Sequence, residues 1–262
     1  MTDWLALCRA AVEDVRGVLA ELPRRSDREP VVGDGMGGDE TTAIDAAAER
    51  AILARFERLG DLTIVSEEVG VLGDGATHVV IDPIDGSLNA KRGIGFFALS
   101  IAVASGPTMG DVDFGFVHDF GTGEEWTATR GEGARLDGTP LDGELPKERI
   151  EILAFEATRT ASVAEKAAAV VDLAYRLRIM GSLALSLCHL AAGRIDAVCS
   201  LKPARAVDIA AAQLLVRERV LAIDLPDAAP FAAAPLDVKG RSRVIAAGTV
   251  EVCRQLAHAL SA

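Results

Sequence analysis

Hydrophobic residues recur at helical spacing near the start of the chain, with charged residues between them. This spacing predicts a helix over residues 3–22, with Thr2 or Asp3 at its start and Pro23 after its end. The same spacing predicts further helices over residues 42–59, 161–177, 181–193, 207–217 and 250–260. We expect the first helix to serve packing alone.

Short stretches rich in β-branched residues and bounded by glycine or proline predict the strands. In the first half they cover residues 62–65, 77–81, 96–104, 111–118, 124–129 and 134–136, and in the second half 150–155, 195–200 and 243–247, with 178–180 short and extended. Closely spaced strands favour an antiparallel sheet in the first half, whereas strands alternate with helices in the second. We predict a layered α/β fold, with an α+β N-terminal half over residues 1–148 and an α/β C-terminal half over residues 149–262.

Two segments show neither kind of spacing. Residues 24–41 are polar and rich in glycine, which predicts a mobile loop: either a plain surface linker or a lid that closes over a neighbouring site. Residues 225–235 are rich in proline and alanine, and we expect a surface connection there. The polar segment 139–148, with Pro140 and Pro146, is the predicted boundary between the halves.

Composition narrows the class of protein. Half of the 262 residues are hydrophobic, which is typical of a globular protein with a large core. No uninterrupted apolar run is long enough to cross a membrane, and the N-terminal residues lack the basic and apolar regions of a secretory signal. The dispersed cysteines, without a C-x-x-C pair, predict buried free thiols and a cytoplasmic protein: Cys8, Cys188, Cys199 and Cys253.

The net charge of −12 argues against nucleic acid and acidic membranes as partners. An anionic substrate would therefore need local positive charge. The four histidines share no ligand spacing, so a zinc site is not expected.

The densest candidate chemistry lies in the sequence IDPIDGS, residues 81–87. Pro83 has no N–H group, so we expect it to end the ladder of the preceding strand and to leave Asp82 and Asp85 in a tight turn. The carbonyl oxygen of Ile84 can then point the same way as both carboxylates. Such hard oxygen ligands suit Mg²⁺ better than Zn²⁺.

The residues that follow this acid pair suit a phosphate. Gly86 lets the backbone approach a ligand closely, and the amides of Gly86 and Ser87 could hold an anion. A calcium EF-hand loop is excluded because Gly93 stands where its twelfth residue must be a glutamate. A plain Asp-Pro turn and an aspartyl-phosphate phosphatase, whose two acids lie two apart rather than three, both stay open.

Other acids lie at the ends of predicted elements. Glu67 and Glu68 follow the strand over residues 62–65, and Asp45 and Asp208 lie in the first turns of helices. A solvated strand end and simple complementing of a helix dipole would explain them equally well.

Three stretches in order along the chain resemble the signatures of the inositol monophosphatase family. They are residues 65–68 (VSEE), 81–89 (IDPIDGSLN) and 207–212 (VDIAAA). Residues 35–39 and 44–45 resemble the family's mobile loop and following helix, and residues 131–134 its glycine turn. The glycine-rich loop and short connections resemble the archaeal-type inositol monophosphatase/fructose-1,6-bisphosphatase branch.

The resemblance implies a role for each matching residue. The implied metal ligands, for two or three Mg²⁺, are Glu67, Asp82, the Ile84 carbonyl, Asp85 and Asp208. The implied catalytic residues are Asp45 and Ser87, which orient the attacking water, and Glu67. The implied contacts to substrate or phosphate are Asp85, Gly86, Ser87, Arg178 and Ser182. Asp39 resembles a loop acid that holds a further metal, and Glu68 is not expected to be a direct ligand.

Departures from the family pattern bear on the substrate. Many inositol phosphatases carry a sugar-binding acid near the position of Ser200, which is absent here, whereas Lys202 and Arg205 could meet a second phosphate. The resemblance implies Mg²⁺-dependent, lithium-sensitive hydrolysis of fructose 1,6-bisphosphate, inositol 1-phosphate or both by metal-activated water, in a homodimer. A phosphatase for 3′-phosphoadenosine 5′-phosphate and a non-catalytic phosphate-binding relative are the alternatives.

Overall fold

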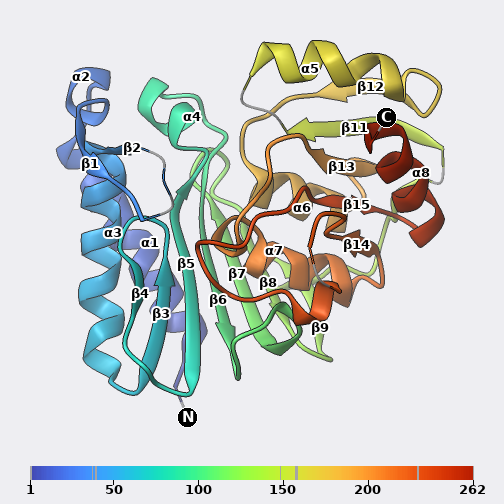
Figure 1. The fold of residues 1–262 in the computed structure, drawn as a ribbon. Helices are drawn as coiled ribbons and strands as arrows, with labels where there is room; N and C mark the ends of the chain where they lie inside the picture. Colours follow the sequence, from blue (N-terminus) through green and yellow to red (C-terminus); the bar gives the residue numbers. More distant parts are fainter. Residues whose placement is uncertain are drawn as a thin grey trace.

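The computed structural model describes residues 2–36, 38, 40–147, 149–156, 159–228 and 230–261. Within these ranges the chain forms alternating layers of helices and sheets (Figure 1). An eight-stranded sheet and a five-stranded sheet flank a central pair of helices, and further helices cover the outer face of each sheet. The predicted layered α/β fold is therefore confirmed.

The eight-stranded sheet belongs to the first half of the chain. Its strand order is β10-β9-β8-β7-β6-β5-β3-β4, and every neighbouring pair is antiparallel except β3 and β5. The strands are β3 (Leu62–Ser66), β4 (Gly70–Leu72), β5 (Thr77–Asp85), β6 (Ala98–Ala104), β7 (Val112–Asp119), β8 (Glu125–Thr129), β9 (Gly133–Leu136) and β10 (Thr139–Pro140). The parallel β3–β5 pair brings the end of β3 beside the acidic motif at the end of β5.

The five-stranded sheet belongs to the second half, in the order β12-β11-β13-β15-β14. Its strands are β11 (Ile150–Glu156), β12 (Ala174–Arg178), β13 (Ala197–Ser200), β14 (Ala222–Asp224) and β15 (Ile245–Ala247). The pairs of β11 with β12 and β13 are parallel and the others antiparallel. A separate hairpin pairs β1 (Val31–Asp34) with β2 (Glu40–Thr42).

The helices divide the core into three parts. α1 (Trp4–Glu21) and α3 (Ala43–Phe56) pack on the outer face of the larger sheet, and α5 (Thr160–Ala167) and α8 (Val250–Ser261) lie beyond the smaller one (Figure 1). Between the sheets lie α6 (Leu183–Ala191) and α7 (Ala206–Glu218). Almost all of α7 is buried, which explains why hydrophobic residues occur on nearly every side of this helix. The central part of the core, in which α7 lies, contains residues from both halves of the chain. The division at residue 148 stays a prediction.

Several shorter elements complete the chain. Two short helices, α2 (Arg25–Arg28) and α4 (Ser87–Arg92), lie near the end of the larger sheet at which β5 ends (Figure 1). The 3₁₀ turns are η1 (Glu57–Leu59), η2 (Met109–Asp111), η3 (Ala168–Val170) and η4 (Phe231–Ala233). Asp3 caps α1 by accepting a hydrogen bond from the Ala6 amide at 3.0 Å, as predicted. All four cysteines are free and buried, as predicted.

The predicted helix over residues 161–177 is wrong in its second half. α5 ends at Ala167, and Ala174–Arg178 forms β12 instead. β12 pairs in parallel with β11 along one side, from Ala174 opposite Ile150 to Arg178 opposite Ala154. Tertiary pairing has overridden the local helical pattern.

The glycine-rich segment is more regular than expected. Residues 24–41 contain α2, β1 and the beginning of β2 rather than a plain loop. The β-branched pair Val31 and Val32 explains the strand, and both side chains are exposed. Asp39 lies outside the described residues, so its predicted role is not placed. No helix in the described ranges is both long and apolar enough to cross a membrane.

Candidate active site

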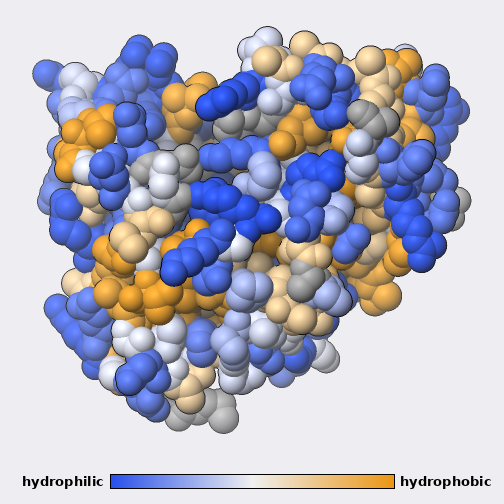
Figure 2. Space-filling model, in the orientation of Figure 1, coloured by the Kyte–Doolittle hydropathy of each residue, from blue (hydrophilic) through white to orange (hydrophobic). Residues whose placement is uncertain are grey.

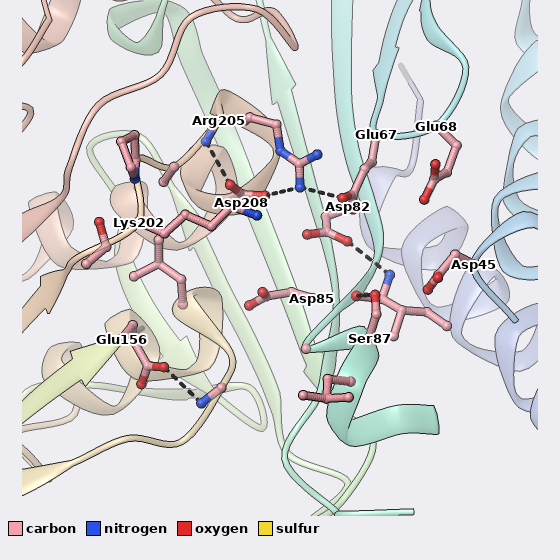
Figure 3. Close-up of a pocket in the computed structure, with 18 of the residues that line it drawn as sticks. Asp45, Glu67, Glu68, Asp82, Asp85, Ser87, Glu156, Lys202, Arg205 and Asp208 are labelled. Carbon is pink, nitrogen blue, oxygen red and sulfur yellow. Dashed lines mark hydrogen bonds and ion pairs between the residues drawn. The ribbon is translucent and has the colours of Figure 1, made fainter. Parts of the chain in front are cut away.

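A pocket of about 300 Å³ opens where the two halves of the chain meet (Figure 3). Figure 2 shows hydrophilic residues gathered in the centre of this face of the molecule. The carboxylates that line the pocket are Glu40, Asp45, Glu67, Glu68, Asp82, Asp85, Glu156 and Asp208. The basic residues that line it are Lys91, Lys202 and Arg205. Acids from predicted elements far apart in the sequence are thus brought together.

A bulge in β5 places the two motif acids on one side. Asp82 lies opposite Ser100 of β6, and Asp85 opposite Ala98, so three residues of β5 span two of β6. Acids three apart would face opposite ways in a regular strand, but the extra residue restores the same face. Pro83 therefore interrupts the strand without ending it, which corrects the prediction that the ladder stops there.

Gly86 then turns the chain out of β5 and into α4. Its φ of +94° lies in the left-handed region, and a Cβ atom here would come within 3.0 Å of the Gly181 carbonyl oxygen and 3.1 Å of that of Phe96. Only glycine fits both constraints. The next residue, Ser87, donates its hydroxyl to the Ile84 carbonyl oxygen at 2.9 Å. The predicted backbone ligand therefore already accepts one hydrogen bond.

The start of α6 fixes Asp85. The Ser182 hydroxyl donates to Asp85 Oδ2 at 2.5 Å, and the Ala184 amide donates to the same oxygen at 2.7 Å. Burial raises the pKa of Asp85 to about 7, although both hydrogen bonds favour its charged form. Ser182, predicted as a substrate contact, is here the residue that positions a predicted metal ligand.

Glu156 at the end of β11 supports this arrangement and was not predicted from the sequence. Its carboxylate accepts hydrogen bonds from the Gly181 amide at 2.8 Å and the Ser186 hydroxyl at 2.7 Å. These contacts tie the segment before α6 to the smaller sheet. Burial raises the pKa of Glu156. The only sequence signal was an acid at the end of a predicted strand.

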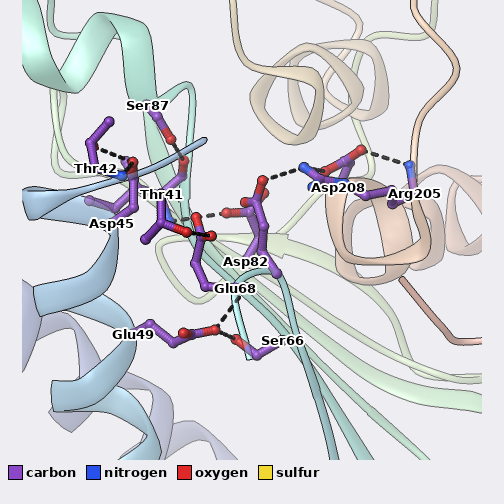
Figure 4. A network of polar contacts seen from close by, with 12 residues as sticks. Thr41, Thr42, Asp45, Glu49, Ser66, Glu68, Asp82, Ser87, Arg205 and Asp208 are labelled. Carbon is purple, nitrogen blue, oxygen red and sulfur yellow. Dashed lines mark hydrogen bonds and ion pairs between the residues drawn. The ribbon is translucent and has the colours of Figure 1, made fainter. Parts of the chain in front are cut away.

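A second unpredicted acid, Glu49, organises the turn after β3 (Figure 4). Its Oε1 atom accepts hydrogen bonds from the Ser66 hydroxyl at 2.6 Å, the Glu68 amide at 3.1 Å and the Val69 amide at 3.2 Å. Glu49 is buried on α3, one helical turn after Asp45. An acid at that spacing on an otherwise hydrophobic face was the available signal.

The turn held by Glu49 presents Glu67 and Glu68 differently. Glu67 points toward Asp82 and Arg205, whereas Glu68 accepts a hydrogen bond from the Thr41 hydroxyl (Figures 3 and 4). Burial raises the pKa of Glu67 to about 8, with Arg205 opposing the shift. Burial also raises the pKa of Glu68.

Arg205 and Asp208 meet at the start of α7. The Arg205 amide donates to Asp208 Oδ2 at 2.7 Å, and its Nη2 donates to Asp208 Oδ1 at 3.1 Å. The same Nη2 forms an ion pair with Glu67. Arg205 is only 6% exposed and contacts two of the predicted metal ligands, and its predicted contact to a second phosphate stays a prediction.

Asp45 has an oxygen available in the pocket. Its Oδ2 accepts from the amide of Thr42, at 3.3 Å, and from the Thr42 hydroxyl. Its Oδ1 is buried and has no hydrogen-bond partner in the described part of the chain. Within the same ranges no hydrogen bond joins Asp45 to Ser87, so any partnership between them would pass through a third group.

The donor set of the pocket fits Mg²⁺. It consists of carboxylate and carbonyl oxygens, including the orphaned Asp45 oxygen, and contains no histidine or cysteine. Burial raises the pKa of Asp82 well above its usual range, and the Glu67 and Asp85 carboxylates add to the shift while Arg205 opposes it, so nearby positive charge favours the ionised cluster. Among the described residues, no three acidic, histidine or cysteine side chains are already arranged to hold one metal ion. Arg205 forms ion pairs with two of the predicted ligands, Glu67 and Asp208.

Arg178 lies elsewhere. It is exposed on the edge strand β12, and its Nη1 atom donates to the Leu177 carbonyl oxygen. It is not among the residues that line the pocket. Its predicted substrate contact stays a prediction.

Comparison with known proteins agrees with this geometry. A fructose-1,6-bisphosphatase/inositol-1-monophosphatase from Methanothermobacter thermautotrophicus is 32% identical over 98% of this chain and 96% of its own length. A Nus factor SuhB from Pasteurella multocida is 34% identical over 83% of each chain. A crystal structure of an inositol monophosphatase–fructose 1,6-bisphosphatase superposes with a TM-score of 0.86 at 27% identity, covering 98% of this chain and 100% of that one.

The layered fold, shared with a solved inositol monophosphatase–fructose 1,6-bisphosphatase, places the chain in the sugar-phosphatase fold class. The model of the inositol monophosphatase family matches residues 5–258. The chain belongs to the inositol monophosphatase family, and the predicted resemblance to its archaeal-type branch is confirmed.

Proposed function

We propose that this protein is a Mg²⁺-dependent phosphate monoester hydrolase for small sugar or inositol phosphates. The observation that carries the proposal is the convergence of Glu67, Asp82, Asp85 and Asp208 on one pocket, beside an Asp45 oxygen that has no partner in the described ranges. Burial disfavours the charged forms of Glu67, Asp82 and Asp85, and a bound cation would stabilise those charged forms. A merely phosphate-binding relative would have no need of it.

The proposed roles follow from the contacts. Glu67, Asp82, the Ile84 carbonyl, Asp85 and Asp208 would hold Mg²⁺, which when bound supplies positive charge for the phosphate and activates water. Asp45 would orient the attacking water by accepting a hydrogen bond from the water at Oδ1. Gly86 and Ser87 would position the phosphate, because both line the pocket beside the ligand carboxylates and their amides can hold an anion.

Direct attack by water is favoured over a phosphorylated enzyme. Asp82 and Asp85 both lie in hydrogen-bonded positions typical of ligands, and the Ser87 hydroxyl donates to a carbonyl oxygen rather than to a general base. Mass spectrometry after acid quenching with substrate tests this. A mass increase of one phosphoryl group on any of these residues would rule out direct attack.

The choice of substrate depends on the basic residues that line the pocket. Lys91 on α4 and Lys202 after β13 line it together with Arg205, which is only 6% exposed and contacts the ligand carboxylates. We assign a second phosphate to Lys91 and Lys202 rather than to Arg205. Fructose 1,6-bisphosphate is then the favoured substrate and inositol 1-phosphate the second.

A phosphate-release assay tests this assignment. We expect hydrolysis of fructose 1,6-bisphosphate and inositol 1-phosphate with Mg²⁺, and weak hydrolysis of 3′-phosphoadenosine 5′-phosphate. Lys202→Gln and Lys91→Gln should each raise the KM for the bisphosphate more than the KM for inositol 1-phosphate. Lys239→Gln, at an exposed lysine outside the pocket, is the control. Equal effects on both substrates would contradict the assignment. The homodimer, the cytoplasmic location and lithium sensitivity stay predictions.

A further inference from the structure

Arg205 engages both oxygens of a predicted metal ligand. Its backbone amide donates to Asp208 Oδ2 at 2.7 Å, and its guanidinium donates to Asp208 Oδ1 at 3.1 Å. The guanidinium also contacts Oε1 of Glu67, so it lies between two ligands that come from opposite halves of the chain (Figure 3). A cation that coordinates these carboxylates must therefore compete with the Arg205 guanidinium for their oxygens.

The low exposure of these three side chains makes the competition strong. The Arg205 side chain is 7% exposed, and those of Glu67 and Asp208 are each 17% exposed, so water screens their interaction weakly. A divalent ion near the same oxygens would repel the guanidinium at short range. A buried guanidinium that leaves its carboxylates needs another anionic partner, because an unpaired buried charge is costly.

The substrate offers that partner. A phosphate group accepts two parallel hydrogen bonds from a guanidinium, a geometry that lysine cannot reproduce. The phosphate-positioning residues Gly86 and Ser87 line the same pocket as Arg205.

We propose that Arg205 and the metal ion compete for Glu67 and Asp208, so that metal binding displaces the guanidinium and turns it to the phosphate of the substrate. The inference rests on the proposed function, since it requires metal and phosphate in this pocket. By linkage, phosphate binding that holds Arg205 away from the carboxylates strengthens metal binding in turn. Arg205 thus sets metal affinity and couples it to occupancy by phosphate.

Calorimetric titrations with Mg²⁺ and with inorganic phosphate test the exchange without turnover. In Arg205→Gln the competitor is absent, so the Kd for Mg²⁺ without phosphate should fall by about tenfold or more. In the same variant the Kd for inorganic phosphate at saturating Mg²⁺ should rise by about tenfold. Arg205→Lys keeps the charge without the fork and should show smaller changes of the same signs.

Lys239→Gln is the control, because it removes a positive charge at an exposed residue outside the pocket. Its Kd for Mg²⁺ should change by less than about threefold. Unchanged or weaker Mg²⁺ binding in both Arg205 variants would overturn the exchange, as would equal tightening in Lys239→Gln. The proposed function fails separately, if the wild-type protein neither binds Mg²⁺ nor releases phosphate.

Discussion

Replacing Asp85 with asparagine should stabilise the fold while it removes activity. The folded-state pKa of Asp85 rises from 3.8 to about 7, chiefly through burial, and this shift already includes its hydrogen bonds to Ser182 and Ala184. The raised pKa therefore lowers the free energy of unfolding by up to about 4 kcal/mol at pH 8, where Asp85 is ionised, and by about 2 kcal/mol at pH 5, where the folded protein keeps it protonated. Asparagine keeps an oxygen that can accept both hydrogen bonds and avoids this cost.

The sign of the pH dependence follows from the raised pKa. The wild-type protein keeps its full stability from this group below about pH 3.8 and loses it as the pH rises toward 7. Because Asp85 is partly exposed to the pocket, water reduces the effect, and we expect a gain of about 1–3 kcal/mol for Asp85→Asn at pH 8. The gain should be smaller at pH 5.

Urea unfolding in EDTA at both pH values measures the effect, with Asp74→Asn at an exposed loop carboxylate as the control. In saturating Mg²⁺ the order should reverse, because the wild-type protein gains binding energy that the variant loses. The reasoning would be refuted if Asp85→Asn were less stable than the wild-type protein in EDTA at pH 8, or if the two proteins were equally stable at both pH values.

Three further experiments test Asp45, Gly86 and Val220. Asp45→Asn should lower turnover by about 10²–10⁴-fold and leave the free energy of unfolding unchanged, since Thr42 still finds an acceptor. Adding Ser87→Ala to this variant should lower turnover little further. Turnover within twofold of wild type would count against the role of Asp45. Gly86→Ala should lower the free energy of unfolding in urea by about 1–3 kcal/mol. Gly123→Ala should cost less, because Gly123 has φ +81° but a Cβ atom there would meet no atom within 4 Å. Equal losses would show that the close approach to Gly181 and Phe96 is unimportant. Val220→Gly should raise the free energy of unfolding in urea by about 0.5–1 kcal/mol, because Val220 has φ +59° and is 89% exposed. A loss of stability would contradict strain at this residue.

Local motifs made much of the site predictable. Asp82, Asp85 and Gly86 lie within one short stretch, so their chemistry could be inferred before their geometry was known. The bulge that turns both acids to one side could not, because it depends on the pairing of β5 with β6. The predicted break at Pro83 followed from proline alone and missed that the ladder resumes at Asp85.

Residues that act on distant parts of the chain escaped prediction. Glu49 organises a turn 17 to 20 residues later, and Glu156 holds a segment 25 residues later. Neither belongs to a motif, and only the assembled layers reveal their partners. The same limit applies to β12, whose helical pattern gave way to pairing with β11.

The central claim is that this pocket hydrolyses phosphate monoesters with the help of Mg²⁺. Release of inorganic phosphate from fructose 1,6-bisphosphate, followed across a Mg²⁺ titration in the wild-type protein and in Asp82→Asn, tests it most directly. Asp82 is buried among the ligand carboxylates and lies at the bulge of β5. We predict Mg²⁺-dependent release by the wild-type protein, none in EDTA, and nearly none from a folded Asp82→Asn variant at any Mg²⁺ concentration. Full release in excess EDTA, or wild-type rates from Asp82→Asn, would contradict the claim.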